Sequence, residues 1–230
     1  EDSLVYFESA RIIAEGRWRE AMQIYPWPLY PSILAGIRKV SGLEVNTSAK
    51  FLNTILFSLA TSSFITIIRL AGGKQLTMAA GALILFSSQY IVGDVLAMLL
   101  RDEGFWAFYL TGLVFFIRFY QERRIKDAFF WQLFMIVATL FRIEAITYLI
   151  FLPALLISDL KTPFRLRLRH FLTCHSLTIF LAIGLIGAMG FHDDLRMKDF
   201  GRLQEVFTTN FYEEWTRQFF EKAKIMSGTV

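Results

Sequence analysis

The sequence predicts an all-α fold, that of a polytopic membrane protein with interfacial helices on its outer side. Of its 230 residues, 55% are hydrophobic and 16% are aromatic, whereas only 19% are charged. These charges gather in clusters between long apolar stretches, whereas a soluble domain intersperses them. The net charge of +4 comes from basic residues in alternate short loops, a pattern typical of membrane topology. We therefore expect contact with membrane lipids and no nucleic-acid partner.

Residues 1–45 are expected to form an external juxtamembrane segment. From Ser3 to Met22 the sequence is too polar for a membrane span and suits a helix lying at the interface, interrupted at Gly16. The strip from Tyr25 to Pro31 contains three prolines, and its aromatic rings suit the depth of the lipid headgroups. It is predicted to be an interfacial loop, followed by a short amphipathic helix from Ser32 to Val40.

Residues 46–190 are expected to form a transmembrane domain of about six helices. The predicted segments are 46–70, 75–92, 103–120, 127–141, 144–159 and 170–190. Two of them, 127–141 and 144–159, hold only about 15 or 16 residues, short of the roughly 20 that a bilayer core requires. Either the membrane is locally thin there, or the turn between them forms the floor of a cavity, the interpretation that we favour. Residues 191–230 read as an external amphipathic segment.

The charges of the connecting loops predict the orientation. Three alternate loops are basic and should be cytoplasmic, and their basic residues are Arg69, Lys74, Arg118, Arg123, Arg124, Lys126, Lys161, Arg165, Arg167, Arg169 and His170. The other loops, with the N-terminal segment, carry the acidic groups and should face outside. Every acidic candidate therefore falls on one side of the membrane, which we expect to be a bacterial inner membrane.

Three groups of residues could carry chemistry on that side. Asp2 and Tyr6 share a helix face, although Asp2 could equally cap that helix. The triplet from Arg101 to Glu103 precedes a span without a polar spacer, so it could reach a lipid headgroup or simply mark the interface. Arg142 could bind a phosphate, or Arg142 and Glu144 could form an ion pair in a tight hairpin. A fourth group, residues 192–194, is a weaker candidate for a metal site.

These residues resemble a known family. The run from Glu1 to Tyr6, the element Gly16-Arg17-Trp18 and the strip from Tyr25 to Gly36 resemble the first external loop of the GT-C glycosyltransferases. They are most similar to the branch of protein mannosyltransferases and lipid A aminoarabinose transferases. The triplet from Arg101 to Glu103 matches the second acidic loop of that family, and residues 141–145 match its arginine-acid-alanine hairpin. The resemblance implies a GT-C-like fold in which a further membrane helix precedes Glu1.

The resemblance also implies a function, the inverting transfer of a sugar from a polyprenyl-phosphate donor to a protein, lipid or glycan acceptor at the outer face. Asp2 would then be the general base. The residues expected to bind substrate are Glu1, Tyr6, Tyr25, Tyr30, Arg101, Asp102, Glu103, Arg142 and Glu144. A divalent cation could assist, although arginines beside the phosphate make it optional. Two alternatives stay open: a transporter or flippase of a lipid-linked or anionic substrate, and a scaffold whose acidic loops bind a partner.

Overall fold

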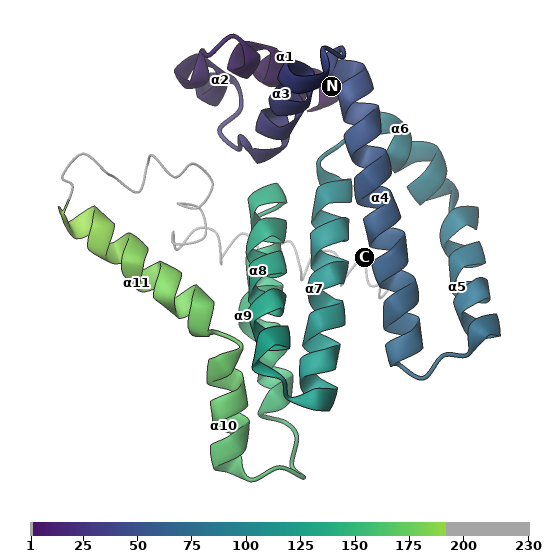
Figure 1. The fold of residues 1–230 in the computed structure, drawn as a ribbon, viewed down its shortest axis with the longest axis vertical. Helices are drawn as coiled ribbons and strands as arrows, with labels where there is room; N and C mark the ends of the chain where they lie inside the picture. The colour runs from purple at the N-terminus through teal and green to yellow at the C-terminus, as the bar shows by residue number, and fades with distance from the viewer. Residues whose placement is uncertain (1, 192–230) are drawn as a thin grey trace, which may run out of the picture. The chain divides into compact units, whose positions relative to one another are not determined.

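The computed structural model describes the backbone of residues 2–191 and the side chains of residues 3–184. By its internal contacts the chain divides into a unit of residues 1–184 and a second unit of residues 185–230. The described part of the chain is helical throughout, so the predicted all-α class is confirmed for it (Figure 1). Its elements are α1 (Asp2–Ala14), α2 (Trp18–Ile24), α3 (Leu29–Ser41), α4 (Val45–Leu70), α5 (Gln75–Ser87), the π-helix η1 (Gln89–Val95), α6 (Leu96–Met98), α7 (Asp102–Glu122), α8 (Ile125–Phe141), α9 (Ala145–Phe151), the 3-10 helix η2 (Leu152–Leu156), α10 (Phe164–Thr173) and α11 (Ser176–Phe191).

The first three helices pack together through small and branched side chains. Ile12, Ile13, Ala21 and Ala35 form a buried cluster that joins α1, α2 and α3. The predicted break at Gly16 is confirmed, because its φ of 83° lies in the left-handed region, which glycine adopts without steric cost.

The predicted loop through residues 25–31 is partly wrong, since α3 already begins at Leu29. Tyr30 and Pro31 therefore belong to the first turn of a helix. Backbone N–H groups in a first turn have no helical acceptor, so a proline there loses no hydrogen bond. Tyr30 consequently has a defined direction that a loop would not impose.

Three long helices, α4, α7 and α8, lie side by side, with α1–α3 at the end where α4 and α7 begin (Figure 1). Small residues bring the axes close: Ala60 and Ala107 are buried in one cluster, and Gly104 faces the ring of Phe141. A Cβ atom on Gly104 would lie only 2.1 Å from the nearest carbon of that ring. The close contact of α7 with α8 therefore requires glycine, which has no side chain, at position 104.

Helix bounds at 46–70, 103–120 and 127–141 are predicted within two residues, whereas three other predicted segments are broken. The segment 75–92 ends at Ser88, whose hydroxyl accepts a hydrogen bond from the Ile91 N–H and starts a π-helix. The segment 144–159 changes to a 3-10 helix around Pro153. The segment 170–190 is divided at His175, whose ring contacts the carbonyls of Phe171 and Ile150. In each case a polar side chain or a proline competes with regular helical hydrogen bonding.

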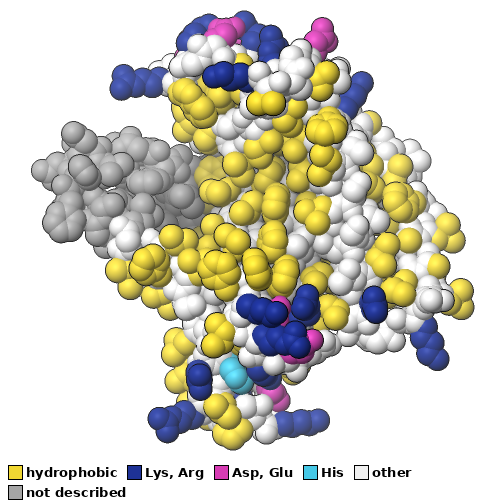
Figure 2. Space-filling model, in the orientation of Figure 1, with side chains coloured by type: hydrophobic (Ala, Val, Ile, Leu, Met, Phe, Trp, Pro, Cys, Tyr) yellow, Lys and Arg dark blue, Asp and Glu magenta, His cyan; other side chains and the backbone are white. Residues whose placement is uncertain are grey.

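Among the described residues, one helix, α4, is long and apolar enough to cross a membrane by itself. A second span is added if α5 and the helical segment Gln89–Met98, which are bent by 44° at their junction, cross as one. On the visible face of the molecule, hydrophobic side chains cover the middle, and charged side chains gather at the two ends (Figure 2). The six predicted spans stay a prediction.

Candidate functional site

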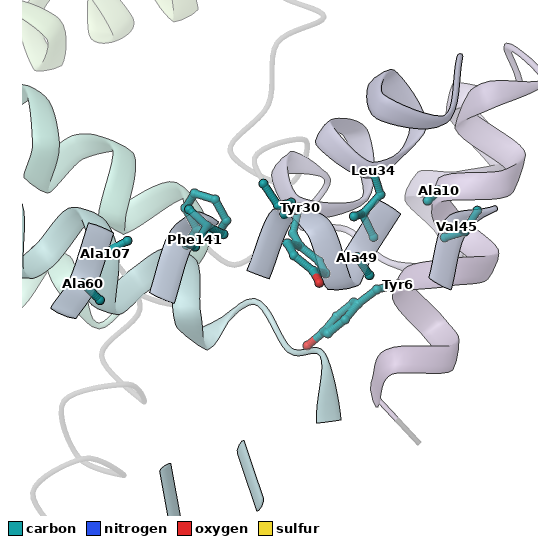
Figure 3. Close-up of a cluster of buried hydrophobic side chains, with 11 residues drawn as sticks. Tyr6, Ala10, Tyr30, Leu34, Val45, Ala49, Ala60, Ala107 and Phe141 are labelled. Carbon is teal, nitrogen blue, oxygen red and sulfur yellow. The ribbon is translucent and has the colours of Figure 1, made fainter. Parts of the chain in front are cut away.

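Three predicted tyrosines meet at the junction of α1–α3 with α4. The ring of Tyr6 on α1 lies 5.0 Å from that of Tyr25 and 5.5 Å from that of Tyr30, both in edge-to-face geometry. Tyr6 and Tyr30 are buried in a cluster with Ala10, Leu34 and other residues (Figure 3). Edge-to-face rings attract each other through their quadrupoles, so this contact holds α1 against α3.

Tyr30 connects this aromatic group to the segment before α7. Its hydroxyl lies 2.9 Å from Oδ1 of Asn53 on α4 and 3.2 Å from the carbonyl of Leu99. The amide Nδ2 of Asn53 in turn donates to the Leu100 carbonyl at 2.9 Å. Burial, with a smaller effect of the Glu103 carboxylate, raises the pKa of Tyr30 well above its usual range. The phenol therefore stays protonated and acts as a donor at neutral pH.

These hydrogen bonds hold a strained turn. Leu99 has a φ of 52° and a ψ of 55°, a left-handed conformation that a side chain disfavours by about 1–2 kcal/mol. Such conformations persist where the surroundings enforce them. Here Tyr30 and Asn53 contact the carbonyls of Leu99 and Leu100, directly before the predicted triplet. The turn thereby sets where Arg101, Asp102 and Glu103 enter α7.

Arg101 faces the tyrosines. Its guanidinium carbon lies 5.7 Å from the centre of the Tyr25 ring, a cation–π arrangement. It forms no salt bridge with any residue whose side chain is described, and it interacts with Glu144 only through longer-range electrostatics. Its charge is therefore not cancelled by a direct carboxylate contact within that part of the chain.

Arg142 is held by two carboxylates. It pairs with Asp102 at the start of α7 and, at 2.8 Å, with Glu144 two residues along the chain. The hydrogen bonds that Arg142 donates to Glu144, together with the charge of Asp102, raise the pKa of Arg142 further above its usual range. The predicted ion pair in the hairpin is present, and it extends to the second acidic loop.

Glu103 is fully buried, and neither of its carboxylate oxygens has a hydrogen-bond partner among the described residues. It lies one residue from Asp102 and close enough to Tyr30 to affect its electrostatics. Burial of a carboxylate costs several kcal/mol, which the nearby Asn53 side chain offsets only in part. Buried polar groups almost always form hydrogen bonds, so the Glu103 carboxyl is an exception.

Eight of the ten predicted site residues thus lie in one connected region, which we call the Arg101 site. It comprises Tyr6, Tyr25, Tyr30, Asn53, Arg101, Asp102, Glu103, Arg142 and Glu144. Asn53 was missed, although an amide within a membrane-length run is a signal that could have found it.

The other two predicted residues precede Tyr6. The side chain of Asp2, and Glu1 as a whole, lie outside the described residues, but the backbone of Asp2 opens α1 one turn before Tyr6. Residues 192–194 also lie outside them. Within the described part of the chain, no group of three or more histidine, cysteine or acidic residues could hold a metal ion.

Comparison with known proteins adds no further information about this site. No family model, curated protein or solved structure matches this chain.

Proposed function

We propose that this protein is a polytopic membrane glycosyltransferase, which moves a sugar from a polyprenyl-phosphate donor to an acceptor at the outer face of a bacterial inner membrane. Two features support the membrane location: charged side chains gather at both ends of the visible face around an apolar middle (Figure 2), and the basic loops alternate along the chain. The resemblance to the GT-C glycosyltransferases suggests the reaction.

One observation carries the proposal, the convergence of the Arg101 site. Its eight predicted residues come from four separate stretches of the sequence, α1, residues 25–30, residues 101–103 and residues 142–144, and each stretch was predicted to face the outer side. The site combines aromatic rings, an arginine without a carboxylate partner among the described side chains and a buried carboxylate. Rings and carboxylates are suited to a sugar, and an arginine is suited to a phosphate.

The reaction can be written with Asp2 as general base. The Asp2 carboxylate takes the proton from an acceptor hydroxyl or amine, which forms the new bond to the anomeric carbon of the sugar. The bond from that carbon to the phosphate oxygen breaks at the same time, and its electron pair leaves with polyprenyl phosphate. Attack from the side opposite the leaving group inverts the anomeric centre. The negative charge thus develops on the phosphate, where a cation lowers the barrier.

Arg101 is the better of the two arginines for this role. Arg142 already pairs with Asp102 and Glu144, so a phosphate would have to displace a carboxylate to reach it. Arg101 has no such competitor among the described side chains, and its contact with Tyr25 keeps one face of the guanidinium occupied. In this scheme Arg142 orients Asp102 and Glu144, which bind the sugar or the acceptor together with Glu103 and the tyrosines. A divalent cation stays an option, since Glu1 and Asp2 could take part in holding it.

A transporter or flippase of a lipid-linked substrate is the second candidate. The observation that favours it is the 44° bend between α5 and the segment Gln89–Met98, because broken helices line the substrate routes of many transporters. The π-helix η1, which follows this bend, contains Asp94, and π-helical distortions are frequent at functional sites. A scaffold without activity is the third candidate.

Release of polyprenyl phosphate separates these functions. The full-length protein in detergent is incubated with a panel of polyprenyl-phosphate sugars and with candidate acceptors, and free polyprenyl phosphate is measured. We expect Asp2→Asn to lower release by about 100-fold or more, the contribution typical of a general base. Arg101→Gln should lower it by about 100-fold, the effect of losing one stabilising group.

The chain offers matched controls for both variants. Glu8→Gln removes a carboxylate from the same helix, where Glu8 is exposed and pairs with Arg11, and Arg38→Gln removes an exposed arginine from α3. Both controls should keep full activity. Undiminished release from Asp2→Asn would eliminate the base assignment. Transport of the donor across vesicles containing the unmodified protein, without any release of polyprenyl phosphate, would establish the transporter instead.

A further inference from the structure

A second charged region lies at the far end of the molecule from α1–α3, on the short helix α10 (Figure 1). Arginine and leucine alternate along this helix. Arg165 and Arg169, four residues apart, share one face, and Leu168 and Leu172, also four residues apart, lie next to them. Its apolar side chains are unusually accessible: Phe164 is 61% exposed, Leu168 40% and Leu172 49%. A helix with exposed leucines among arginines is typical of a membrane surface.

The same helix carries a groove. A shallow, open surface depression of about 410 Å³, which we call the α10 groove, is lined by Arg165, Leu168, Arg169, Leu172, Thr173 and Ser176. Its two arginines are one helical turn apart, and its leucines continue the groove toward α11. Positive charge beside apolar surface matches an anionic headgroup joined to an acyl chain.

The charge of these two arginines is not neutralised within the described part of the chain. Arg118, Arg123 and Arg124 at the same end pair with Asp127, Asp159 and Glu122 respectively. Neither Arg165 nor Arg169 forms a salt bridge with any residue whose side chain is described.

Arg167, which lies between them in sequence, points elsewhere. It donates to the carbonyl of Ile157 at 2.6 Å and stacks over the Phe164 ring at 5.5 Å. Arg167 thereby attaches α10 to the preceding segment, while its two neighbours stay available for a ligand.

We propose that the α10 groove binds an anionic phospholipid of the cytoplasmic leaflet, with the phosphate between Arg165 and Arg169 and an acyl chain along Leu168 and Leu172. The assignment rests on the proposed membrane location, because the basic loops place α10 on the cytoplasmic side. Charge complementarity selects this occupant: basic pockets at the cytoplasmic ends of helices attract anionic headgroups, and a zwitterionic lipid supplies no net charge. The site is separate from the Arg101 site and takes no part in sugar transfer.

The test compares two lipids with identical acyl chains. Full-length protein in a neutral detergent is titrated with phosphatidylglycerol or with phosphatidylcholine, and retained lipid is counted by native mass spectrometry. We expect phosphatidylglycerol to bind preferentially. The double variant Arg165→Gln, Arg169→Gln should weaken its binding by about 30-fold, since each cation near an anionic surface contributes about fivefold.

The double variant Lys126→Gln, Lys161→Gln is the matched control, because it removes the same charge from two exposed positions at the same end, outside the groove. Equal weakening by both double variants, or no weakening by the arginine variant, would overturn the proposal. Displacement of phosphatidylglycerol by soluble glycerol phosphate at equal concentration would also overturn it, because the leucines would then contribute nothing. Asp2→Asn should retain lipid binding, and the arginine variant should retain sugar transfer, so failure of one proposal is distinct from failure of the other.

Discussion

Asn53 links three parts of the Arg101 site, and its replacement by leucine should disconnect them. The amide accepts from Tyr30 through Oδ1 and donates to the Leu100 carbonyl through Nδ2, and the side chain is only 2% exposed. Leucine has a similar volume but no polar atoms. The substitution Asn53→Leu therefore removes two hydrogen bonds without opening a large cavity.

The cost follows from which groups lose their partners. The Leu100 carbonyl loses its Asn53 donor, whereas the Tyr30 hydroxyl keeps the Leu99 carbonyl as an acceptor. Loss of the hydrogen bond from Tyr30 costs about 1 kcal/mol, and leaving the Leu100 carbonyl without its donor costs about 1–3 kcal/mol. We expect a total of about 2–4 kcal/mol, or a fall in the unfolding midpoint of roughly 5–15 °C.

The effect on activity should be larger than this loss of stability suggests. Without Asn53 the strained Leu99 can relax, and the start of α7 shifts together with Arg101 and Asp102. A displacement of about 1 Å at reacting groups can lower a rate by about 100-fold. The assay is polyprenyl-phosphate release at a temperature where the variant is still folded, with the unfolding midpoint measured in parallel.

A neighbouring residue provides the control. Thr54→Leu introduces the same side chain on the exposed face of α4, where it should change neither quantity appreciably. Tyr30→Phe should lie between the two, because the bond from Asn53 to Leu100 survives in it. If Asn53→Leu matches Thr54→Leu in both the midpoint and the rate, Asn53 does not position the site.

Two further predictions concern the start of α7. Gly104→Ala should destabilise the protein by about 1–3 kcal/mol in thermal unfolding, because the new Cβ overlaps the buried Phe141 ring. Its control is Gly36→Ala, in open space on α3, which should be neutral or slightly stabilising. Equal unfolding midpoints for the two variants would refute the contact between Gly104 and Phe141. Glu103→Gln should raise the unfolding midpoint, because it removes a buried carboxylate charge, yet lower sugar transfer by about 10-fold or more. The exposed Glu122→Gln on the same helix should change neither, and full transfer by Glu103→Gln would exclude Glu103 from the site.

The local pattern of residues was enough to predict several helices and their ends. The stretch 46–70 is hydropathic enough on average to cross a membrane, so the bounds of α4 could be predicted within one residue. Gly16 ends α1 because few other residues tolerate its backbone conformation. The ends of regular α-helix at Ser88 and near Pro153 were missed, because a serine or proline within an apolar stretch does not by itself say whether the helix continues.

The candidate site was predictable as separate pieces, each a short charged or aromatic motif beside an apolar run. Topology also predicted that these pieces share one side, since loops alternate between the two sides of a membrane. Neither the motifs nor the topology predicts which side chains are in contact, because residues such as Arg142 and Asp102 are 40 positions apart. Hence the choice between Arg101 and Arg142 could not be made before the structure described their partners.

Composition and periodicity are local properties of the chain, so they were sufficient for the all-α class, the order of the helices and the grouping of charged residues. Partnership between distant side chains depends on how the helices pack, and only the tertiary structure decided it. In the tertiary structure Asn53 accepts a hydrogen bond from Tyr30, and Arg142 pairs with two carboxylates. Glu103 is buried there without a hydrogen-bond partner among the described residues. The physical reason is that burial and hydrogen bonding are set by neighbours in space, whereas helix formation is set largely by neighbours in sequence.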